Sequence, residues 1–432
     1  MISKEDKMPK LLFDRPYVYG CGEKYVAVED GFIAYIGSER PDKLFDRVIS
    51  GKNRLMLPGL YNLHTHAAMT LFRGYGEELP LSRWLNERIF PAEELLTPER
   101  VYVASKFACA EMIKNGIVSF SDMYFFCDET AKAVLESGMK ANISRSIVSF
   151  DPESDPAKDD RVKEALRLYD EYNGEGSGRL RVDLSLHAEY TNTERMCCHL
   201  AGEAKSRGAV MHIHLSETED EHKACLERHN MTPAEFMRFC GVFDNPTVAA
   251  HCVFVTDGDI EIFKNTGVTV AHNPVSNLKL GSGIAPLNKF LDSGVNVALG
   301  TDGAASNNTL DIMKEMYVAA ILHKGAARRA DIISAETVIK MATENGASAQ
   351  RRDGCGVIAE GNKADLILID TDTLNNIPSF DPAYTAVYSA NSSDVRMTVC
   401  DGEILYENGE FTKIDIERIK ADMKKISEDY FK

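Results

Sequence analysis

The sequence predicts an α/β protein built on a closed (β/α)8 barrel of parallel strands, with a small β-sandwich made from both ends of the chain. Two observations support this fold class. From about residue 57 to about residue 350, short β-rich runs alternate with segments of helical periodicity. Outside this region, apolar and polar residues alternate between Gly turns, as in small sheets. The chain of 432 residues is long enough for one large barrel with an addition.

Eight candidate strands share short runs of β-branched and aliphatic residues. They are LPGLYNLHTH (57–66), IVSFSDM (117–123), ANISRSIV (141–148), RVDLSLHA (181–188), VMHIHLSE (210–217), TVAAHC (247–252), VTVAHNP (268–274) and NVALGTDG (296–303). Intervening segments such as 99–116 and 128–139 have apolar residues at helical spacing and end in Gly. Eight such units predict a closed parallel barrel.

The two flanks, residues 11–56 and about 355–410, predict small antiparallel strands. Each flank is too short to bury a core alone. We therefore expect one discontinuous β-sandwich domain from residues 1–58 and 355–432, with the barrel domain of residues 59–354 between its halves. The tail 414–432 has the pattern of one amphipathic helix.

Composition narrows the class of protein. The chain is 44% hydrophobic and 27% charged, as in ordinary globular proteins. Its net charge of −17 argues against nucleic acid or an anionic membrane as a partner. Ten scattered cysteines without a C-x-x-C pair predict reduced thiols. The polar start MISKEDKMPK, and the lack of any apolar run of about 20 residues, predict a cytoplasmic protein.

Residues of the kinds that bind metal follow four of the eight predicted strands. The first strand ends in His64-Thr65-His66, whose spacing of two places both imidazoles on one face. The fifth ends in His212-Ile213-His214-Leu215-Ser216-Glu217, the sixth in His251 and the eighth in Thr301-Asp302-Gly303. A lone H-x-H is weak evidence, and each of these residues could be a core residue or a cap. Their common position at the carboxyl ends of barrel strands instead favours one shared site.

The candidate metal ligands are His64, His66, His214 and Asp302. Three imidazole nitrogens and one carboxylate oxygen suit one divalent ion, zinc before iron or manganese, and leave room for a solvent ligand. Such an ion lowers the pKa of its water from about 16 to about 7, which provides hydroxide as a nucleophile at neutral pH.

Longer motifs join these residues over nearly the whole chain. They are LPGLYNLHTHAAMTLFRGYGEELPLSRWL (57–85), MHIHLSETE (211–219), AAHCV (249–253), HNPVSNLKLGSGIAPL (272–287), LGTDGAASNNTLD (299–311) and EGNKADLILID (360–370). The sequence resembles the amidohydrolase superfamily and, more narrowly, its methylthioadenosine/S-adenosylhomocysteine deaminase family. The resemblance implies a TIM-like metal-dependent hydrolase barrel with a composite β-sandwich. It also implies hydrolysis of the adenine of S-adenosylhomocysteine, 5′-methylthioadenosine or a related 5′-substituted adenosine to hypoxanthine, with release of ammonia.

Attack on an aminopurine requires proton transfers that three residues are placed to make. We expect Glu217 to protonate ring N1 and His251 to stabilise the attacking oxygen. Asp302 would take the proton from water and pass it to the departing amino group. Glu217 could also be a solvated acid in the run ETEDE. The fourth strand, RVDLSLHAEY (181–190), lacks the lysine that bridges two metals in binuclear relatives, so one metal is expected.

The resemblance further implies five substrate contacts. Trp84 would pack near the nucleoside, Glu93 would accept the ribose 2′- and 3′-hydroxyls, and His187 would hydrogen-bond the purine. Arg145 and Arg161 would receive the carboxylate of S-adenosylhomocysteine, a task suited to the planar guanidinium. The segment DPESDPAKDD before Arg161 departs from the family pattern, and a solvated surface arginine is an equal alternative there. Trp84, Glu93 and His187 could instead be a core residue, a helix-start acid and a packed barrel residue.

Polar residues after the last two strands are expected to shape loops around the site without a catalytic role. They are His272, Asn273, Ser276, Asn277, Ser306 and Asn307.

Two other functions remain open at this stage. A related barrel could deaminate a free base of the guanine, cytosine or pterin type, or displace another leaving group, although Glu93 and Arg145 favour a nucleoside. The combination of Glu217 and Asp302 favours deamination. A non-catalytic scaffold on the same fold is disfavoured because the ligand set is complete. A homo-oligomer is expected from the resemblance alone.

Overall fold

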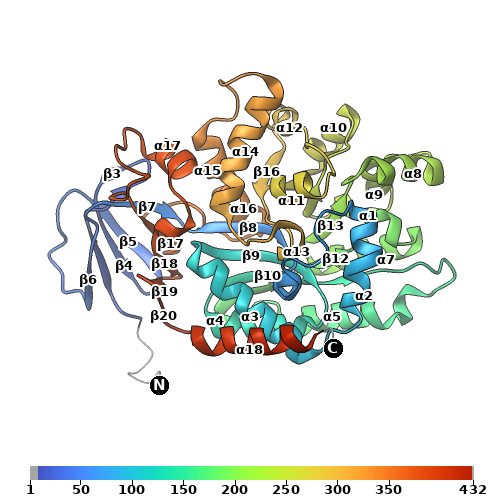
Figure 1. Ribbon diagram of the computed structural model, residues 1–432, viewed down its shortest axis with the longest axis horizontal. Coiled ribbons are helices and arrows are strands. Elements are labelled where there is room, and N and C mark those ends of the chain that lie inside the picture. Colours follow the sequence, from blue (N-terminus) through green and yellow to red (C-terminus); the bar gives the residue numbers. More distant parts are fainter. Residues whose placement is uncertain (1–7, 431–432) are drawn as a thin grey trace.

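The computed structural model describes residues 8–430. In Figure 1 the N-terminal strands and β17–β20 lie together on the left, the barrel with its helices lies on the right, and the last helix runs below the barrel. Residues 1–7 of the predicted sandwich, and residues 431–432 of the predicted tail helix, lie outside the described residues. Within them the tail forms α18 (Ile416–Asp429), which packs against α3 (Pro98–Lys114).

A parallel sheet in the order β16-β15-β14-β13-β12-β10-β9-β8 forms the barrel. Its strands are β8 (Leu60–Thr65), β9 (Ile117–Tyr124), β10 (Lys140–Ile147), β11 (Leu180–Val182), β12 (Leu184–Leu186), β13 (Met211–Leu215), β14 (Thr247–His251), β15 (Thr269–His272) and β16 (Asn296–Leu299). All eight predicted strand regions are present, and the predicted fold class is confirmed. The fourth region is divided at Asp183 into β11 and β12, and the first is divided at Gly59, before which β7 ends.

The barrel closes through hydrogen bonds between the first and last strands. The Asp302 N–H donates to the His64 carbonyl at 2.9 Å. The Asn62 side chain donates to the Thr301 hydroxyl at 2.7 Å and accepts from the Thr301 N–H at 2.9 Å. Because all four residues are buried, water does not compete for these bonds. The carboxyl ends of β8 and β16 are therefore held side by side.

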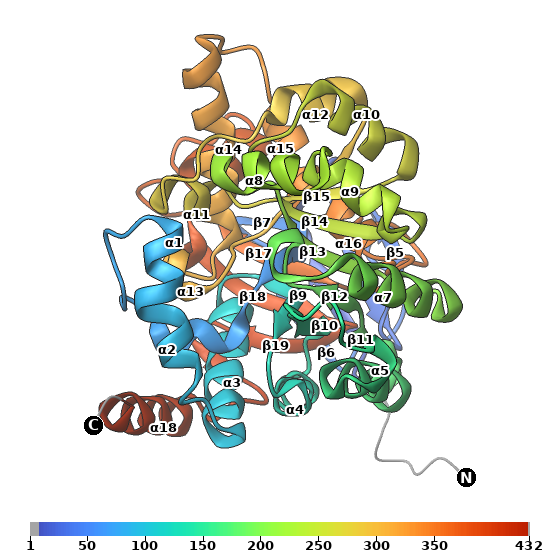
Figure 2. The same ribbon diagram turned by 90° about the vertical axis from the view of Figure 1, so that its right-hand side faces the viewer.

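Helices surround the strands, as Figure 2 shows with β9, β10, β12 and β13 at the centre. Those between or after the barrel strands are α3, α4 (Cys127–Ser137), α5 (Asp160–Tyr172), α6 (Glu175–Gly178), α7 (Glu194–Arg207), α8 (Glu219–His229), α9 (Pro233–Phe239), α10 (Asp257–Thr266), α11 (Pro274–Lys279), α12 (Leu287–Ser293), α13 (Ala304–Asn307), α14 (Ile312–Ala327), α15 (Ala335–Ala342) and α16 (Glu344–Ala349). Hydroxyl side chains such as Thr97, Thr218 and Thr256 cap the first backbone N–H groups of α3, α8 and α10. Two short helices, α1 (Leu81–Trp84) and α2 (Phe90–Glu93), follow β8 and lie at the barrel mouth.

Two smaller sheets contain strands from both flanks. The first has the order β5-β4-β1-β6 and the second β20-β19-β18-β17-β7-β2-β3. Their strands are β1 (Leu11–Asp14), β2 (Tyr17–Val18), β3 (Gly22–Glu23), β4 (Tyr25–Glu29), β5 (Phe32–Gly37), β6 (Arg47–Ser50), β7 (Arg54–Pro58), β17 (Leu366–Asp370), β18 (Val395–Cys400), β19 (Glu403–Glu407) and β20 (Glu410–Phe411). One apolar cluster with members from both sheets, including Phe13, Val28, Leu366 and Val399, joins them as the composite sandwich.

The prediction that all flanking strands are antiparallel is wrong for two pairs. Strand β1 pairs in parallel with β6, and β2 pairs in parallel with β7. In both pairs four other strands lie between the two partners in the chain, and the second partner runs in the same direction as the first. Alternation of apolar and polar residues shows which face of a strand is buried but not which strand lies beside it, so the sequence pattern did not reveal this pairing.

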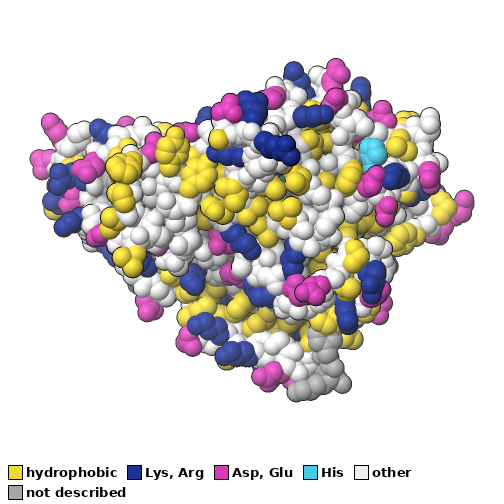
Figure 3. All heavy atoms as spheres, turned by 45° about the horizontal axis from the view of Figure 1, so that its top comes forward, with side chains coloured by type: hydrophobic (Ala, Val, Ile, Leu, Met, Phe, Trp, Pro, Cys, Tyr) yellow, Lys and Arg dark blue, Asp and Glu magenta, His cyan; other side chains and the backbone are white. Residues whose placement is uncertain are grey.

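The surface in Figure 3 gathers hydrophobic side chains over part of one face, with charged side chains of both signs around them. Between β17 and β18, the side chains of Leu374 and Phe380 are 101% and 95% exposed. The expected homo-oligomer stays a prediction.

Among residues 8–430, every helix is too short or too polar to cross a bilayer. All ten cysteines have free thiols.

A buried ion pair joins the base of the barrel to the sandwich. The Lys140 ammonium, at the start of β10, lies 2.6 Å from a carboxylate oxygen of Asp365, just before β17, and 2.9 Å from Asp401. Asp365 also accepts hydrogen bonds from the Tyr61 hydroxyl and the Asp401 N–H. Burial disfavours ionisation, but the charge of Lys140 dominates and lowers the pKa of Asp365. The ion pair is therefore charged on both sides.

Asp365→Asn is expected to lower the free energy of unfolding by about 3 kcal/mol, because it leaves the buried Lys140 charge poorly compensated. Urea denaturation measures this loss. Glu219→Gln, which removes an exposed partner of Lys223, serves as the control and should leave the transition nearly unchanged. Equal unfolding curves for the two variants would contradict the stabilising role of the Lys140–Asp365 pair.

Candidate active site

The candidate ligands meet at the carboxyl ends of the barrel strands. His64 lies on β8 and His66 follows it, His214 lies on β13, and Asp302 follows β16. All are buried. Candidate ligand atoms of His64, His66 and His214 lie within 4.8 Å of one another, as do those of His64, His251 and Asp302. Strand ends separated by up to 238 residues along the chain thus form one cluster.

Hydrogen bonds on the far side of two imidazoles set their orientation. The His66 Nδ1–H donates to the Met123 carbonyl at 2.6 Å, and the His214 Nδ1–H donates to the His187 carbonyl at 2.7 Å. The Nε2 atoms of His66 and His214 then face each other at 3.2 Å. Second-partner bonds of this kind fix the ring and its tautomer in metal sites.

His64 shows that these residues fit a cation. Its Nδ1 lies 2.9 Å from Nε2 of His212, while its own Nε2 is buried without a hydrogen-bond partner. That Nε2 lies 3.5 Å from a carboxylate oxygen of Asp302, and the Nε2 of His66 lies 3.2 Å from the same oxygen. A nitrogen lone pair directed at a carboxylate is repulsive unless a positive charge lies between them. The donor set of three nitrogens and one oxygen therefore suits a divalent metal ion.

The pKa values describe the same charge distribution. Burial and the neighbouring histidines hold the pKa of His214 well below its usual range, so this ring is neutral, as a ligand must be. Burial alone would raise the pKa of Asp302, but His64 and His66 keep it far lower. Burial likewise opposes protonation of His66, yet Asp302 raises the pKa of His66 to about 9. An ionised carboxylate thus attracts positive charge to the point where the rings meet.

Two serines hold Asp302 in place. The Ser276 hydroxyl donates to its Oδ2 at 2.7 Å, and the Ser306 hydroxyl donates to the same oxygen at 2.9 Å. The Gly303 N–H donates to Oδ1 at 2.8 Å. Asp302 itself has a left-handed φ of 60°, which is uncommon for a residue other than Gly. The short helices α11 and α13, which follow β15 and β16, therefore position the carboxylate.

Glu217 and His251 face each other beside the ligand cluster. Nε2 of His251 lies 3.8 Å from a carboxylate oxygen of Glu217. The His251 Nδ1–H donates a hydrogen bond to the side-chain oxygen Oδ1 of Asn277 at 2.8 Å, which directs Nε2 toward the site. The Ser282 hydroxyl donates to Glu217 at 3.2 Å. Burial raises the pKa of Glu217, which helps it retain a proton that it can donate.

The sequence reasoning gave no role to two residues that the structure places in this network. Glu221, in the first turn of α8, accepts hydrogen bonds from the N–H groups of Ser216 and Glu217 at 2.9 and 2.7 Å. It thereby holds the turn that carries Glu217. His212 supports His64 through the contact already described. The spacing of Glu217 and Glu221 by four was visible in the run ETEDE, but nothing in that run distinguishes a buried acid from solvated ones.

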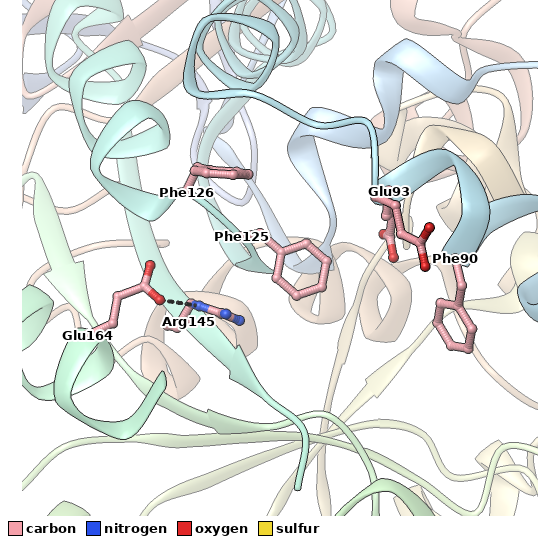
Figure 4. A pocket seen from close by; sticks show the side chains of 7 residues that line it. Phe90, Glu93, Phe125, Phe126, Arg145 and Glu164 are labelled. Carbon is pink, nitrogen blue, oxygen red and sulfur yellow. Dashed lines mark hydrogen bonds and ion pairs between the residues drawn. The ribbon is translucent and has the colours of Figure 1, made fainter. Parts of the chain in front are cut away.

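A cavity of about 430 Å³ lies beside the ligand cluster and contains two of the predicted substrate residues, Glu93 and Arg145. In Figure 4, Glu93 and Phe90 come from one side, Arg145 and Glu164 from the other, and Phe125 lies between. The ring of Tyr124, next to Phe125, is 6.1 Å from that of His66. Burial raises the pKa of Glu93 to about 7, against the lowering effects of Tyr124 and His66.

The other predicted substrate residues lie outside the lining of this cavity. His187 is 4.8 Å from His214 between ring centroids, and its Nδ1 is 3.1 Å from the Thr191 hydroxyl. Trp84 is buried at the end of α1, where its ring would lie 3.1 Å from a Cβ added at Gly76. Arg161 forms two hydrogen bonds with the Asp159 carboxylate, at 2.9 and 2.6 Å. The roles given to these three residues stay predictions.

Three imidazoles and a carboxylate at the mouth of an α/β barrel define the site of a metal-dependent hydrolase. The chain belongs to the amidohydrolase family, whose pattern matches residues 55–405. The predicted resemblance is thus confirmed, as is the prediction of a metal-dependent enzyme with a His/Asp metal site.

Two relatives and one solved structure show what the chain is similar to. A 5-methylthioadenosine/S-adenosylhomocysteine deaminase from Acetivibrio thermocellus is 42% identical over 407 residues, which cover 93% of this chain and 94% of that protein. A 5′-deoxyadenosine deaminase from Methanosarcina mazei is 43% identical over 404 residues, which cover 94% and 93%. The crystal structure of an adenosine deaminase from Xanthomonas campestris with bound zinc has a TM-score of 0.92 at 29% identity, and the match covers 98% of both chains.

Gly300, two residues before the candidate ligand Asp302, has no room for a side chain. An added Cβ would clash with the side-chain oxygen Oδ1 of Asn273 and would lie 2.9 Å from the backbone nitrogen of His64. Gly300→Ala is therefore expected to separate β8 from β16, lower the free energy of unfolding by about 3 kcal/mol and weaken metal binding. Denaturation and metal analysis measure the two effects.

The control is Gly202→Ala on α7, where an added Cβ meets no atom within 4 Å. This change should preserve metal binding and stabilise the helix slightly. If Gly300→Ala bound metal as tightly as the control variant, the close contact between β8 and β16 would not be needed for the site.

Proposed function

We propose that the protein is a hydrolytic deaminase that converts the adenine of a 5′-substituted adenosine to hypoxanthine and releases ammonia. S-adenosylhomocysteine, 5′-methylthioadenosine and 5′-deoxyadenosine are the candidate substrates, in keeping with the names of relatives at 42% and 43% identity. The observation that carries the proposal is the meeting of a His/Asp metal site with the Glu217–His251 pair and a cavity that contains Glu93.

The ligands we propose are His64, His66, His214 and Asp302, and the ion we propose is zinc, the metal in the similar adenosine deaminase structure. One ion suffices, because the fourth strand region, now β11 and β12, offers Asp183 and His187 but no lysine. When bound, the ion supplies a water molecule of lowered pKa that can act as a nucleophile at neutral pH.

Proton transfer is assigned to three buried residues. Glu217 donates a proton to ring N1, which makes C6 electrophilic. His251 donates a hydrogen bond from Nε2 to the attacking oxygen and stabilises the tetrahedral centre. Asp302 accepts one proton of the attacking water and transfers it to the amino group, and the second water proton returns to Glu217 as the C6 carbonyl forms. A C6–O bond forms, the C6–N bond breaks, and ammonia leaves.

Substrate binding is assigned to residues around the same mouth. Glu93 accepts hydrogen bonds from the ribose 2′- and 3′-hydroxyls, and His187 hydrogen-bonds the purine. Trp84, at the end of α1, packs near the nucleoside. The Tyr430 hydroxyl donates to the carbonyl of Ala92 at 2.7 Å, so the end of α18 buttresses the helix that presents Glu93. A free base has no ribose hydroxyls to donate to Glu93, which favours a nucleoside.

The proposal is tested by an ultraviolet assay for loss of the adenine chromophore, with ammonia measured in parallel. Protein that contains about one metal ion per chain should deaminate at least one of S-adenosylhomocysteine, 5′-methylthioadenosine, 5′-deoxyadenosine and adenosine. Chelation should abolish the activity and zinc should restore it. Ammonia release from guanine or cytosine alone would favour a free-base deaminase, and metal-free inactive protein would favour a scaffold.

Glu217→Gln is expected to lower kcat by about 100-fold or more, because an amide has no proton to deliver to N1. Metal content should stay unchanged, since Glu217 is not a proposed ligand. Glu219→Gln, two residues away on the exposed start of α8, should keep normal activity. Loss of metal in the Glu217 variant, or full activity, would contradict the role of a proton donor.

A further inference from the structure

The cavity beside the ligand cluster combines apolar walls with an excess of acidic groups. Its lining contains three phenylalanines, three carboxylates and, among the described residues that form it, one cation. They are Phe90, Glu93, Glu94, Phe125, Phe126, Arg145 and Glu164. Even with Glu93 protonated, the lining carries more negative than positive charge.

The single cation is already paired. Nε of Arg145 donates to the carboxylate of Glu164 at 2.7 Å, as the dashed line in Figure 4 marks. Its NH1 group donates to the carbonyl of Ser146, and the guanidinium lies 5.0 Å from the ring centroid of Phe125. The Arg145 side chain is only 13% exposed, so solvent screens this ion pair weakly. Its positive charge is largely compensated before any ligand enters.

Arg161, the other arginine predicted to bind a substrate carboxylate, does not add positive charge to the described lining of this cavity. Arg161 is the nearest arginine in sequence on the same side of the barrel, and both of its hydrogen bonds go to Asp159. It is absent from the described lining of the cavity. A carboxylate entering the cavity would therefore meet one neutralised arginine and two or three like charges.

We infer, on the basis of the proposed function, that Glu164 is a specificity-determining residue that makes this cavity select uncharged, apolar 5′-substituents of the nucleoside. The phenylalanines offer dispersion contacts to a methyl or methylthio group. A tail with a carboxylate must displace Glu164 from Arg145 or accept repulsion from the acids. The substrate class is thus 5′-deoxy- or 5′-alkylthio-adenosine rather than a nucleoside with an anionic tail.

A zwitterionic amino-acid tail could in principle place its carboxylate on Arg145 and its ammonium on Glu164. Strong carboxylate binding by arginine uses two parallel N–H donors. Two of the five N–H donors of Arg145 are already used, the Nε–H by Glu164 and one hydrogen of NH1 by the Ser146 carbonyl, so an entering carboxylate must share the guanidinium with Glu164. The geometry therefore favours exclusion of a tail that carries a carboxylate. Binding of a zwitterionic tail is the alternative that the experiment distinguishes.

The experiment uses three 5′-thioadenosines with tails of similar length, namely propyl, 3-aminopropyl and 2-carboxyethyl, together with S-adenosylhomocysteine. For the wild-type protein, kcat/KM should be at least about tenfold higher for the propyl than for the carboxyethyl compound. Glu164→Gln should reduce this preference about fivefold or more, through a lower KM for the carboxyethyl compound. Turnover of the propyl compound by the same variant is the reference for this ratio.

Two variants control for structure. Glu171→Gln lies on the same helix, α5, and removes an exposed partner of Arg167, so it should preserve the wild-type preference. Glu164→Asp retains the negative charge and should preserve most of the wild-type preference for the propyl compound. Thermal unfolding of each variant checks that the fold is intact.

The outcomes separate the two proposals. If the wild-type protein turns over the propyl compound but Glu164→Gln leaves the preference unchanged, the role of Glu164 is wrong and the proposed function stands. A fall in kcat/KM for S-adenosylhomocysteine in Glu164→Gln would show that Glu164 binds the ammonium of a zwitterion, which also overturns the inference. If metal-loaded wild-type protein deaminates none of the compounds, both proposals fail.

Discussion

The contact between the first and last barrel strands is the constraint on which the site depends. The Asp302 N–H bonds to the His64 carbonyl, so the backbone that closes the barrel also joins two proposed ligands. The Asn62–Thr301 pair reinforces this seam, and Gly300 lets the strands approach without a side chain between them. Closure of the fold and assembly of the site are therefore one event. A partly formed barrel would hold the imidazoles of β8 without their carboxylate.

Around this seam, each reactive side chain has a buried partner that sets its direction. Serines hold Asp302, Asn277 orients His251, and Glu221 fixes the turn before α8. Backbone strain accompanies these contacts, because Ser216, His251 and Asp302 all have positive φ values of 50°, 72° and 60°. Such conformations persist only where the surrounding structure holds them, and they concentrate at functional sites. The strained backbone conformations thus lie where proton transfer requires a precise geometry, and the buried hydrogen bonds offset their free-energy cost.

The sequence predicted the barrel and the cluster of ligands because both follow from local patterns. Strand periodicity and the spacing of His64 and His66 are short-range features, and parallel strands bring their carboxyl ends together whatever the loops contain. The parallel pairing of β1 with β6, the buried position of Glu221 and the pairing of Arg145 with Glu164 depend on distant or tertiary contacts. No periodicity distinguishes an acid that a neighbour buries from one in water, so these features required the three-dimensional structure.

The two ends of the barrel treat charge in opposite ways. At the base, Lys140 has acidic partners at hydrogen-bond distance on both sides, so its charge is compensated within the protein. At the mouth, buried atoms such as Nε2 of His64 and Oγ of Ser216 have no hydrogen-bond partner in the described chain. Buried polar atoms of this kind cost free energy unless a ligand satisfies them. The base therefore contributes stability by itself, whereas the proposed metal ion and substrate would satisfy the polar atoms at the mouth and so would couple ligand binding to the stability of the barrel.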